Sequence, residues 1–154
     1  EAPIYSLDAT STTKAIKEFQ TFIDRYPTSE RVARCNNLID ELRGKLSVKA
    51  FENAKQYYTT ASYKSAIIAL DNVLVDFPSF NNREEVHYLI VRSSYLLAKN
   101  SISTKIEERL KATLDVYSQF KDNYPESEYL KELESTYNKT QETLTELKQN
   151  KDEI

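Results

Sequence analysis

The sequence has one glycine, one cysteine, one histidine and four prolines, and it lacks tryptophan and methionine among its 154 residues. One cysteine excludes a disulfide within the chain, and one cysteine with one histidine is too few for a zinc site of the usual ligands. A single glycine excludes the glycine-rich loops that hold phosphates. Because sheets and long loops require more turn-forming residues, the composition indicates an almost wholly helical chain.

Charge and hydropathy exclude further classes of protein. The net charge of −3, with both signs mixed along the chain, gives no field that would attract nucleic acid or an anionic membrane. No apolar run approaches the roughly 18 residues needed to span a bilayer. The sequence therefore predicts neither a nucleic-acid-binding protein nor a membrane-spanning segment.

The two most reactive side chains do not predict catalysis. His87 has no cysteine, serine or acid beside it at the spacing of a catalytic motif, so a surface or packing role is expected. Cys35 falls on an apolar helix seam, where it is most simply a small buried hydrophobic residue. The acidic residues are dispersed over helix faces as solvated charge. We expect no enzyme and no cofactor or metal site.

The stretch from Ala50 to Pro78 contains a complete helical hairpin. Both halves carry apolar residues at the three-and-four spacing of one helix face. Thr59 to Tyr63 is long enough only to turn the chain, so the two helices are predicted to pack antiparallel. The apolar positions are Phe51, Ala54, Tyr57, Tyr58 and Ala61 in the first half, and Ala66, Ile67, Leu70, Val73, Leu74 and Phe77 in the second.

The end of this hairpin recurs twice. Segments ending at Pro27, Pro78 and Pro125 share a small residue twelve positions before the proline, large apolar residues eight and five before it, and an aromatic residue directly before it. The pattern resembles the second helix of a tetratricopeptide repeat, and Ala54 and Tyr57 fit its first helix. The predicted fold is all-α, a tetratricopeptide-like α-solenoid of antiparallel helical hairpins.

The repeats are longer than the standard motif. The prolines lie 51 and 47 residues apart, whereas a tetratricopeptide repeat has about 34 residues. An apolar seam from Val32 to Leu46 leads directly into the hairpin, with Thr28 or Ser29 as a cap, so we expect one long helix over about 29–60. Gly44 alone interrupts it, at a cost of about 1 kcal/mol that does not break a helix.

Further boundaries follow from the same reasoning. Helices are expected over about 12–26, 82–99 and 103–123 and from 127 onward. The last of these carries a seam that would cover the open end of the stack. Three regions result: an extended or loose segment over 1–12, a helical-repeat domain over 13–148 that begins in mid-repeat, and a disordered tail over 149–154.

The tyrosines divide into two groups. Four occupy packing positions of the repeat and are expected in the core: Tyr26, Tyr57, Tyr117 and Tyr124. Four others are less constrained: Tyr58, Tyr63, Tyr88 and Tyr129. Because solenoids bind through the face lined by the first helices of their hairpins, the predicted partner surface contains Lys55, Tyr58, Ser93 and Leu97, with Arg92 and Lys99 as a charged rim.

Three segments together resemble the BamD (YfiO/ComL) family. They are KAIKEFQTFIDRYPTSERVARCNNLIDELRGKL, AFENAKQYYTTASYKSAIIALDNVLVDFP, and SSYLLAKNS followed by a longer helix and YPESEYLKELE. The long helix and the insertion after Lys99 also agree with the layout of that family. The likeness runs from Lys14 to Tyr137 and matches the C-terminal part of such proteins.

The resemblance implies a non-enzymatic lipoprotein of the machine that inserts β-barrels into bacterial outer membranes. It implies binding to the periplasmic domain of the barrel-forming subunit, contact with other assembly lipoproteins and with unfolded barrel precursors, and a place on the periplasmic face of the outer membrane. Membrane attachment would come only from a lipid anchor absent from this chain, because Cys35 has no lipobox. The alternative is another periplasmic tetratricopeptide scaffold, of the cell-division coordinator type, whose repeats are more regular.

Overall fold

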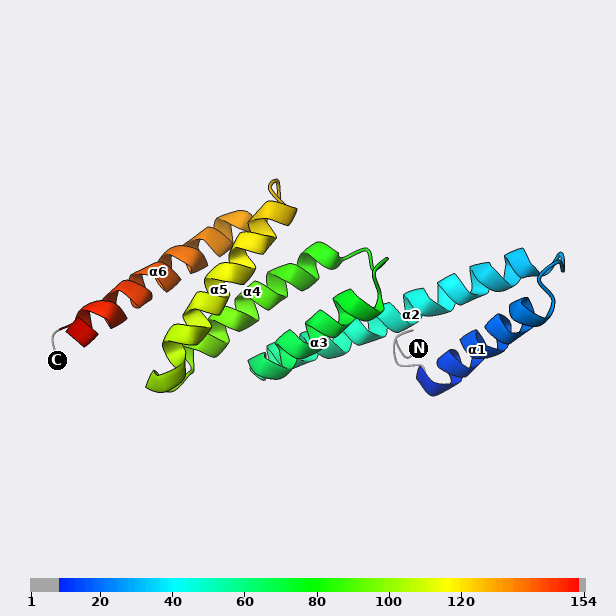
Figure 1. Cartoon of the computed structure of the whole chain (residues 1–154), viewed down its shortest axis with the longest axis horizontal. Coiled ribbons are helices and arrows are strands. Elements are labelled where there is room, and N and C mark those ends of the chain that lie inside the picture. The colour runs from blue at the N-terminus through cyan, green and yellow to red at the C-terminus, as the bar shows by residue number, and fades with distance from the viewer. Residues whose placement is uncertain (1–8, 153–154) are drawn as a thin grey trace.

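Residues 9–152 are described by the computed structural model, and within them apolar residues at helical spacing form six α-helices and no strand. Successive helices pack antiparallel along an elongated array (Figure 1). This confirms the all-α, tetratricopeptide-like fold. The helices are α1 (Ala9–Arg25), α2 (Val32–Thr59), α3 (Tyr63–Asp76), α4 (Arg83–Lys99), α5 (Ser103–Asn123) and α6 (Leu130–Asp152).

The proline turns share one hydrogen bond. In each, the carbonyl of the aromatic residue before the proline accepts the backbone N–H three residues further on. Proline suits the second position of such a turn because its φ is fixed and its nitrogen carries no hydrogen. The recurring sequence pattern is therefore a recurring backbone structure. The bonds are Ser29 to Tyr26 at 3.1 Å, Phe80 to Phe77 at 3.0 Å, and Ser127 to Tyr124 at 3.2 Å.

Two serines stabilise these turns and do not cap helices. The hydroxyl oxygen of Ser29 accepts the N–H of Arg31 at 3.3 Å, and that of Ser127 accepts the N–H of Tyr129 at 3.1 Å. The next helices begin only at Val32 and Leu130. The predicted starts at 29 and 127 were therefore about three residues early, because a serine before a helix can bond within a turn as well as at a cap.

The long helix is confirmed as α2, which has 28 residues. α1 packs along its first half and α3 along its second half, and α1 and α3 do not contact each other. One helix therefore belongs to two hairpins, and this arrangement accounts for the wide spacing of the first two prolines.

The turn after α2 uses a left-handed residue. Ala61 has φ of 57°, a conformation in which glycine is usual. The carbonyl of Tyr58 accepts the N–H of Ala61 at 3.1 Å, and the carbonyl of Tyr57 accepts the N–H of Ser62 at 2.9 Å. These two bonds close the helix and direct the chain back into α3.

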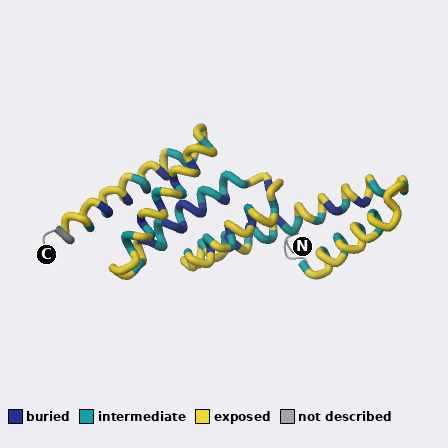
Figure 2. Tube along the Cα trace, in the orientation of Figure 1, coloured by how far each residue is buried: buried dark blue, intermediate teal, exposed yellow. Residues whose placement is uncertain are grey.

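The helices from α2 to α6 form the core, in which buried residues gather in three clusters (Figure 2). By contrast, no residue of α1 is buried. The predicted seam of α6 covers the stack as expected, since Leu133 and Leu144 are buried against α5 and α4. The clusters are Phe51, Ala54, Ala66, Leu70, Val73, Phe80, Val86, Leu89 and Ile90, then Val91, Tyr117, Phe120 and Leu133, then Ala98, Leu110 and Leu144.

Two tyrosines expected in the core lie outside it. Tyr117 is buried, but Tyr26 and Tyr57 are 51% and 46% exposed. Tyr26 follows the end of α1, and its ring meets that of Phe22 at a tilt of 48° with centroids 5.3 Å apart. No further described helix covers that side of α1. The prediction was wrong for both residues, and for Tyr26 the reason is that repeat position implies burial only where a neighbouring helix is present.

The chain ends differ from the expected boundaries. α1 begins at Ala9, three residues before the predicted start, and α6 continues to Asp152. Residues 149–152, placed in a tail by the sequence, are thus helical, and residues 1–8 and 153–154 lie outside the described part of the chain.

Candidate partner-binding surface

α2, α4 and α6 form one row along the molecule. These are the first helices of successive hairpins, and α4 contacts both α2 and α6 directly. We call this row of three helices the α2–α4–α6 face. Five of the six predicted site residues retain exposed surface on α2 or α4, and they are Lys55, Tyr58, Arg92, Leu97 and Lys99.

An ion pair joins α2 to α4. Lys55 Nζ lies 2.7 Å from Glu85 Oε1 and 5.6 Å from the centre of the Phe51 ring. The hydrogen bond to Glu85 raises the pKa of Lys55. Both side chains are partly exposed, so the pair fixes the lysine while leaving it open to solvent.

A second group of contacts joins α4 to α6. Arg92 Nη1 lies 3.2 Å from Glu132 Oε1 and donates to the Thr136 hydroxyl at 3.3 Å. The Tyr88 hydroxyl donates to Glu132 Oε2 at 3.0 Å, and its ring stacks on Tyr129 with centroids 4.2 Å apart. Burial and the bond to Glu132 raise the pKa of Tyr88 to about 12.

Tyr58 lies near the second group, because it influences the pKa values of Tyr88 and Arg92. Its ring is half-buried against the core and meets Tyr63 edge-on at 6.1 Å. Burial lowers the pKa of Arg92, but the hydrogen bond with Tyr58 and the charge of Glu132 outweigh it, so the net shift is upward. The less constrained tyrosines are therefore two ring pairs, Tyr58 with Tyr63 and Tyr88 with Tyr129.

The remaining predicted residues are placed differently. Ser93 has no exposed surface, so it lies beneath the α2–α4–α6 face and offers no contact to a partner. Leu97 is half-buried, and Lys99 is exposed at the end of α4, about 10 Å along the helix from Arg92. Lys99 is thus separate from the ion pairs.

Sequence reasoning missed the acidic partners Glu85 and Glu132. Glu132 is 44 residues from Tyr88, and helical periodicity within α6 does not show which turn meets α4. The tyrosines at unconstrained positions were the available signal of a binding surface. They pointed to Tyr88 and Tyr129, but they gave no indication of Glu132, whose carboxylate lies between α4 and α6.

The reactive residues take packing positions. Cys35 is buried in α2, as predicted. His87 packs against Tyr124 with ring centroids 5.6 Å apart, and burial together with nearby Arg83 lowers its pKa. Residues 9–152 contain no group of three histidine, cysteine or acidic side chains placed to hold a metal ion. Within the same range, each helix is too short or too polar to span a bilayer.

The sequence matches the model of the YfiO family, described as outer membrane lipoprotein, over residues 49–149. The match begins within α2 and ends within α6, so it contains all six predicted site residues, while α1 and the first half of α2 lie outside it. No curated protein matches the chain. Since the matched region covers well over half of the residues, the chain belongs to the YfiO family of outer membrane lipoproteins.

Proposed function

We propose that this chain is a non-enzymatic scaffold of the machinery that assembles β-barrel proteins in the outer membrane, working on the periplasmic side. The observation that carries the proposal is membership of the YfiO family over residues 49–149. A stack of helical hairpins supports a scaffold role, because such stacks offer extended surfaces to other proteins. The family match favours this function over that of a cell-division scaffold.

The binding surface that we propose for the periplasmic domain of the barrel-forming subunit is the α2–α4–α6 face. Partner surfaces are enriched in tyrosine and arginine, and this face presents both where Tyr88 and Arg92 meet Glu132. The ion pairs fix the side chains before binding, so little rotamer entropy is lost when a partner docks. Lys99 adds an exposed positive charge at the rim.

Binding of the purified periplasmic domain to the chain, measured by calorimetry, tests the surface. The double variant Lys55→Gln, Lys99→Glu removes one paired and one unpaired cation from the α2–α4–α6 face. We expect affinity to fall at least about tenfold, which is about 1.4 kcal/mol. Lys55 and Lys99 both keep solvent exposure, so the melting temperature should change little.

A matched control comes from the second helices. Lys111 pairs with Glu107 at 2.8 Å on α5, and Lys64 is exposed on α3. The double variant Lys111→Gln, Lys64→Glu therefore makes the same change in charge on α3 and α5, outside the α2–α4–α6 face. It should bind the periplasmic domain normally. Equal affinities of the two double variants would refute the proposed surface, and no binding by the unaltered chain would refute the proposed partner.

A further inference from the structure

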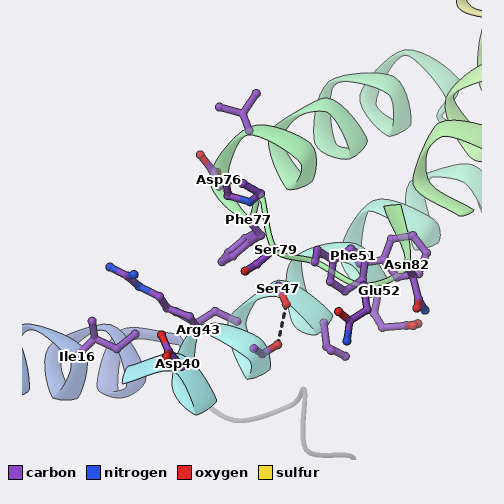
Figure 3. A pocket seen from close by; sticks show the side chains of 17 residues that line it. Ile16, Asp40, Arg43, Ser47, Phe51, Glu52, Asp76, Phe77, Ser79 and Asn82 are labelled. Atoms are coloured by element: carbon purple, nitrogen blue, oxygen red, sulfur yellow. Dashed lines mark hydrogen bonds between the residues drawn. The ribbon is translucent and has the colours of Figure 1, made fainter. Parts of the chain in front are cut away.

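The gap between α1 and α3 forms a cleft. Both helices pack on α2 without contacting each other, and the start of α1 faces the end of α3 across the middle of α2 (Figure 3). The cleft has a volume of about 1040 Å³, at the upper end of the range for ligand pockets. None of the six predicted partner-binding residues lines it, although much of it lies on α2, and part of it lies on residues before position 49.

The floor of the cleft contains two phenylalanine rings and a serine whose hydroxyl is hydrogen-bonded within α2. Phe51 and Phe80 are buried there with ring centroids 5.3 Å apart. The Ser47 hydroxyl donates to the carbonyl of Gly44 at 2.8 Å (Figure 3). A ligand would therefore contact the floor through apolar groups.

Apolar side chains also stand at the rim. Val75 is 75% exposed and Val48 is 43% exposed. Ile16 of α1 contributes a half-buried side chain to the opposite wall. Burying these aliphatic groups under a partner would be favourable at about 25 cal/mol per Å² of area removed from water.

The charge at the cleft is negative. Three carboxylates line it, from Asp40, Glu52 and Asp76, against the single cation of Arg43. Within residues 9–152, Asp40 and Asp76 form no ion pair. Figure 3 shows Asp40 and Arg43 on α2 and Asp76 at the end of α3.

A cation lies at the end of α3. The last turn of a helix carries partial negative charge on its free carbonyls, and that of α3 contains no basic residue. Arg83 donates to the carbonyls of Leu74 and Pro78, at 3.2 and 3.3 Å. The charge of Arg83 thus offsets the partial charge of this end, so the negative charge at the cleft comes from the carboxylates of Asp40, Glu52 and Asp76.

We propose that this cleft binds a segment of a partner protein in which apolar side chains alternate with lysine or arginine. The apolar side chains would cover the floor and the valines, and the cations would pair with Asp40 and Asp76. A second copy of the chain fits less well, because a two-fold contact would bring the same carboxylates of both copies together. The cleft gives the scaffold a docking site in addition to the α2–α4–α6 face.

Fluorescence anisotropy with three labelled octapeptides tests the composition of the ligand. Each has a glycine-serine frame around four central residues: two leucines alternating with two lysines, two leucines with two glutamates, or two serines with two lysines. We expect the leucine-lysine peptide to bind the full chain at least about fivefold more tightly than either of the others. Equal binding of the two lysine peptides would overturn the apolar part of the proposal, and absence of binding would overturn it entirely.

Charge-reversal variants locate the binding site. Asp40→Lys, Asp76→Lys should weaken binding of the leucine-lysine peptide at least about fivefold. Asp115→Lys, Asp122→Lys makes the same change in net charge at two exposed positions of α5 and should leave binding unchanged. If both variants lost the same affinity for the peptide, the loss would be an effect of net charge alone, and the proposed site would be overturned. Sedimentation of the unaltered chain as a dimer that the first variant dissociates would assign the cleft to a second copy instead.

Discussion

Replacing the one glycine of the chain should stabilise it. Gly44 is exposed in the interior of α2, its φ is not positive, and a Cβ built on it meets no atom within 4 Å. Glycine in a helix interior costs about 0.8–1.0 kcal/mol relative to alanine, because the unfolded chain loses more freedom. Gly44→Ala should therefore raise the free energy of unfolding by about 0.8–1.0 kcal/mol, which corresponds to roughly 3 °C in melting temperature at this chain length.

Urea denaturation followed by circular dichroism measures this change, and the slope with urea should stay the same because the exposed area is unchanged. Gly44→Pro is the opposing control. It removes the backbone N–H that bonds within α2 and should destabilise by about 3 kcal/mol. If Gly44→Ala lowered stability, α2 would have to be bent or closely approached at this residue, and the continuous helix would be refuted.

Four further results are expected. Ala61→Gly should stabilise the chain by roughly 0.5–1 kcal/mol in urea, because the left-handed φ of 57° strains a residue with a Cβ; a loss would contradict the turn. Ala66→Phe should cost about 1–3 kcal/mol, since Ala66 is fully buried between helices, and an unchanged urea midpoint would place it elsewhere. The pKa of Tyr88 is raised from 10.0 to about 12, so the unfolded state loses this proton first and the free energy of unfolding should fall between pH 10 and 12. The fall should be smaller in Tyr88→Phe. If both proteins lost stability equally over this pH range, the contact of Tyr88 with Glu132 would be excluded as the cause of the fall. The pKa of His87 is lowered from 6.5, so the unfolded state binds a proton more readily and the free energy of unfolding should decline as the pH falls below about 6.5. His87→Gln should remove this decline if burial of the His87 ring is its source.

Local pattern was sufficient to predict the helices. The seam from Val32 through Leu46 predicted a single helix over about 29–60, and α2 runs from Val32 to Thr59. The apolar stripe and the proline turns depend on residues within a few positions of one another, so sequence spacing alone determines them. Tyr26 shows where this reasoning stops, because its exposure depends on whether another helix covers α1.

The partner surface was predictable only in part. The repeat register placed Tyr58 and Arg92 on first helices, and the structure places both side chains partly exposed on α2 and α4. Glu132 could not be found in this way, because its contact with Arg92 depends on the angle at which α6 crosses α4. Ser93 shows the same limit, since adjacent positions of one helix differ by about 100° and a small error in register moves a residue from the surface into the core.

The helix shared by two hairpins would transmit motion from one hairpin to the other. With 28 residues, α2 extends roughly 42 Å, and a helix of this kind curves gently where it lacks proline. A tilt of about 10° at the α1 end would move the opposite end by roughly 7 Å, a simple consequence of that length. A displacement of α1 would therefore reach α3 and α4 as a rotation of α2, because no loop interrupts α2 between these contacts.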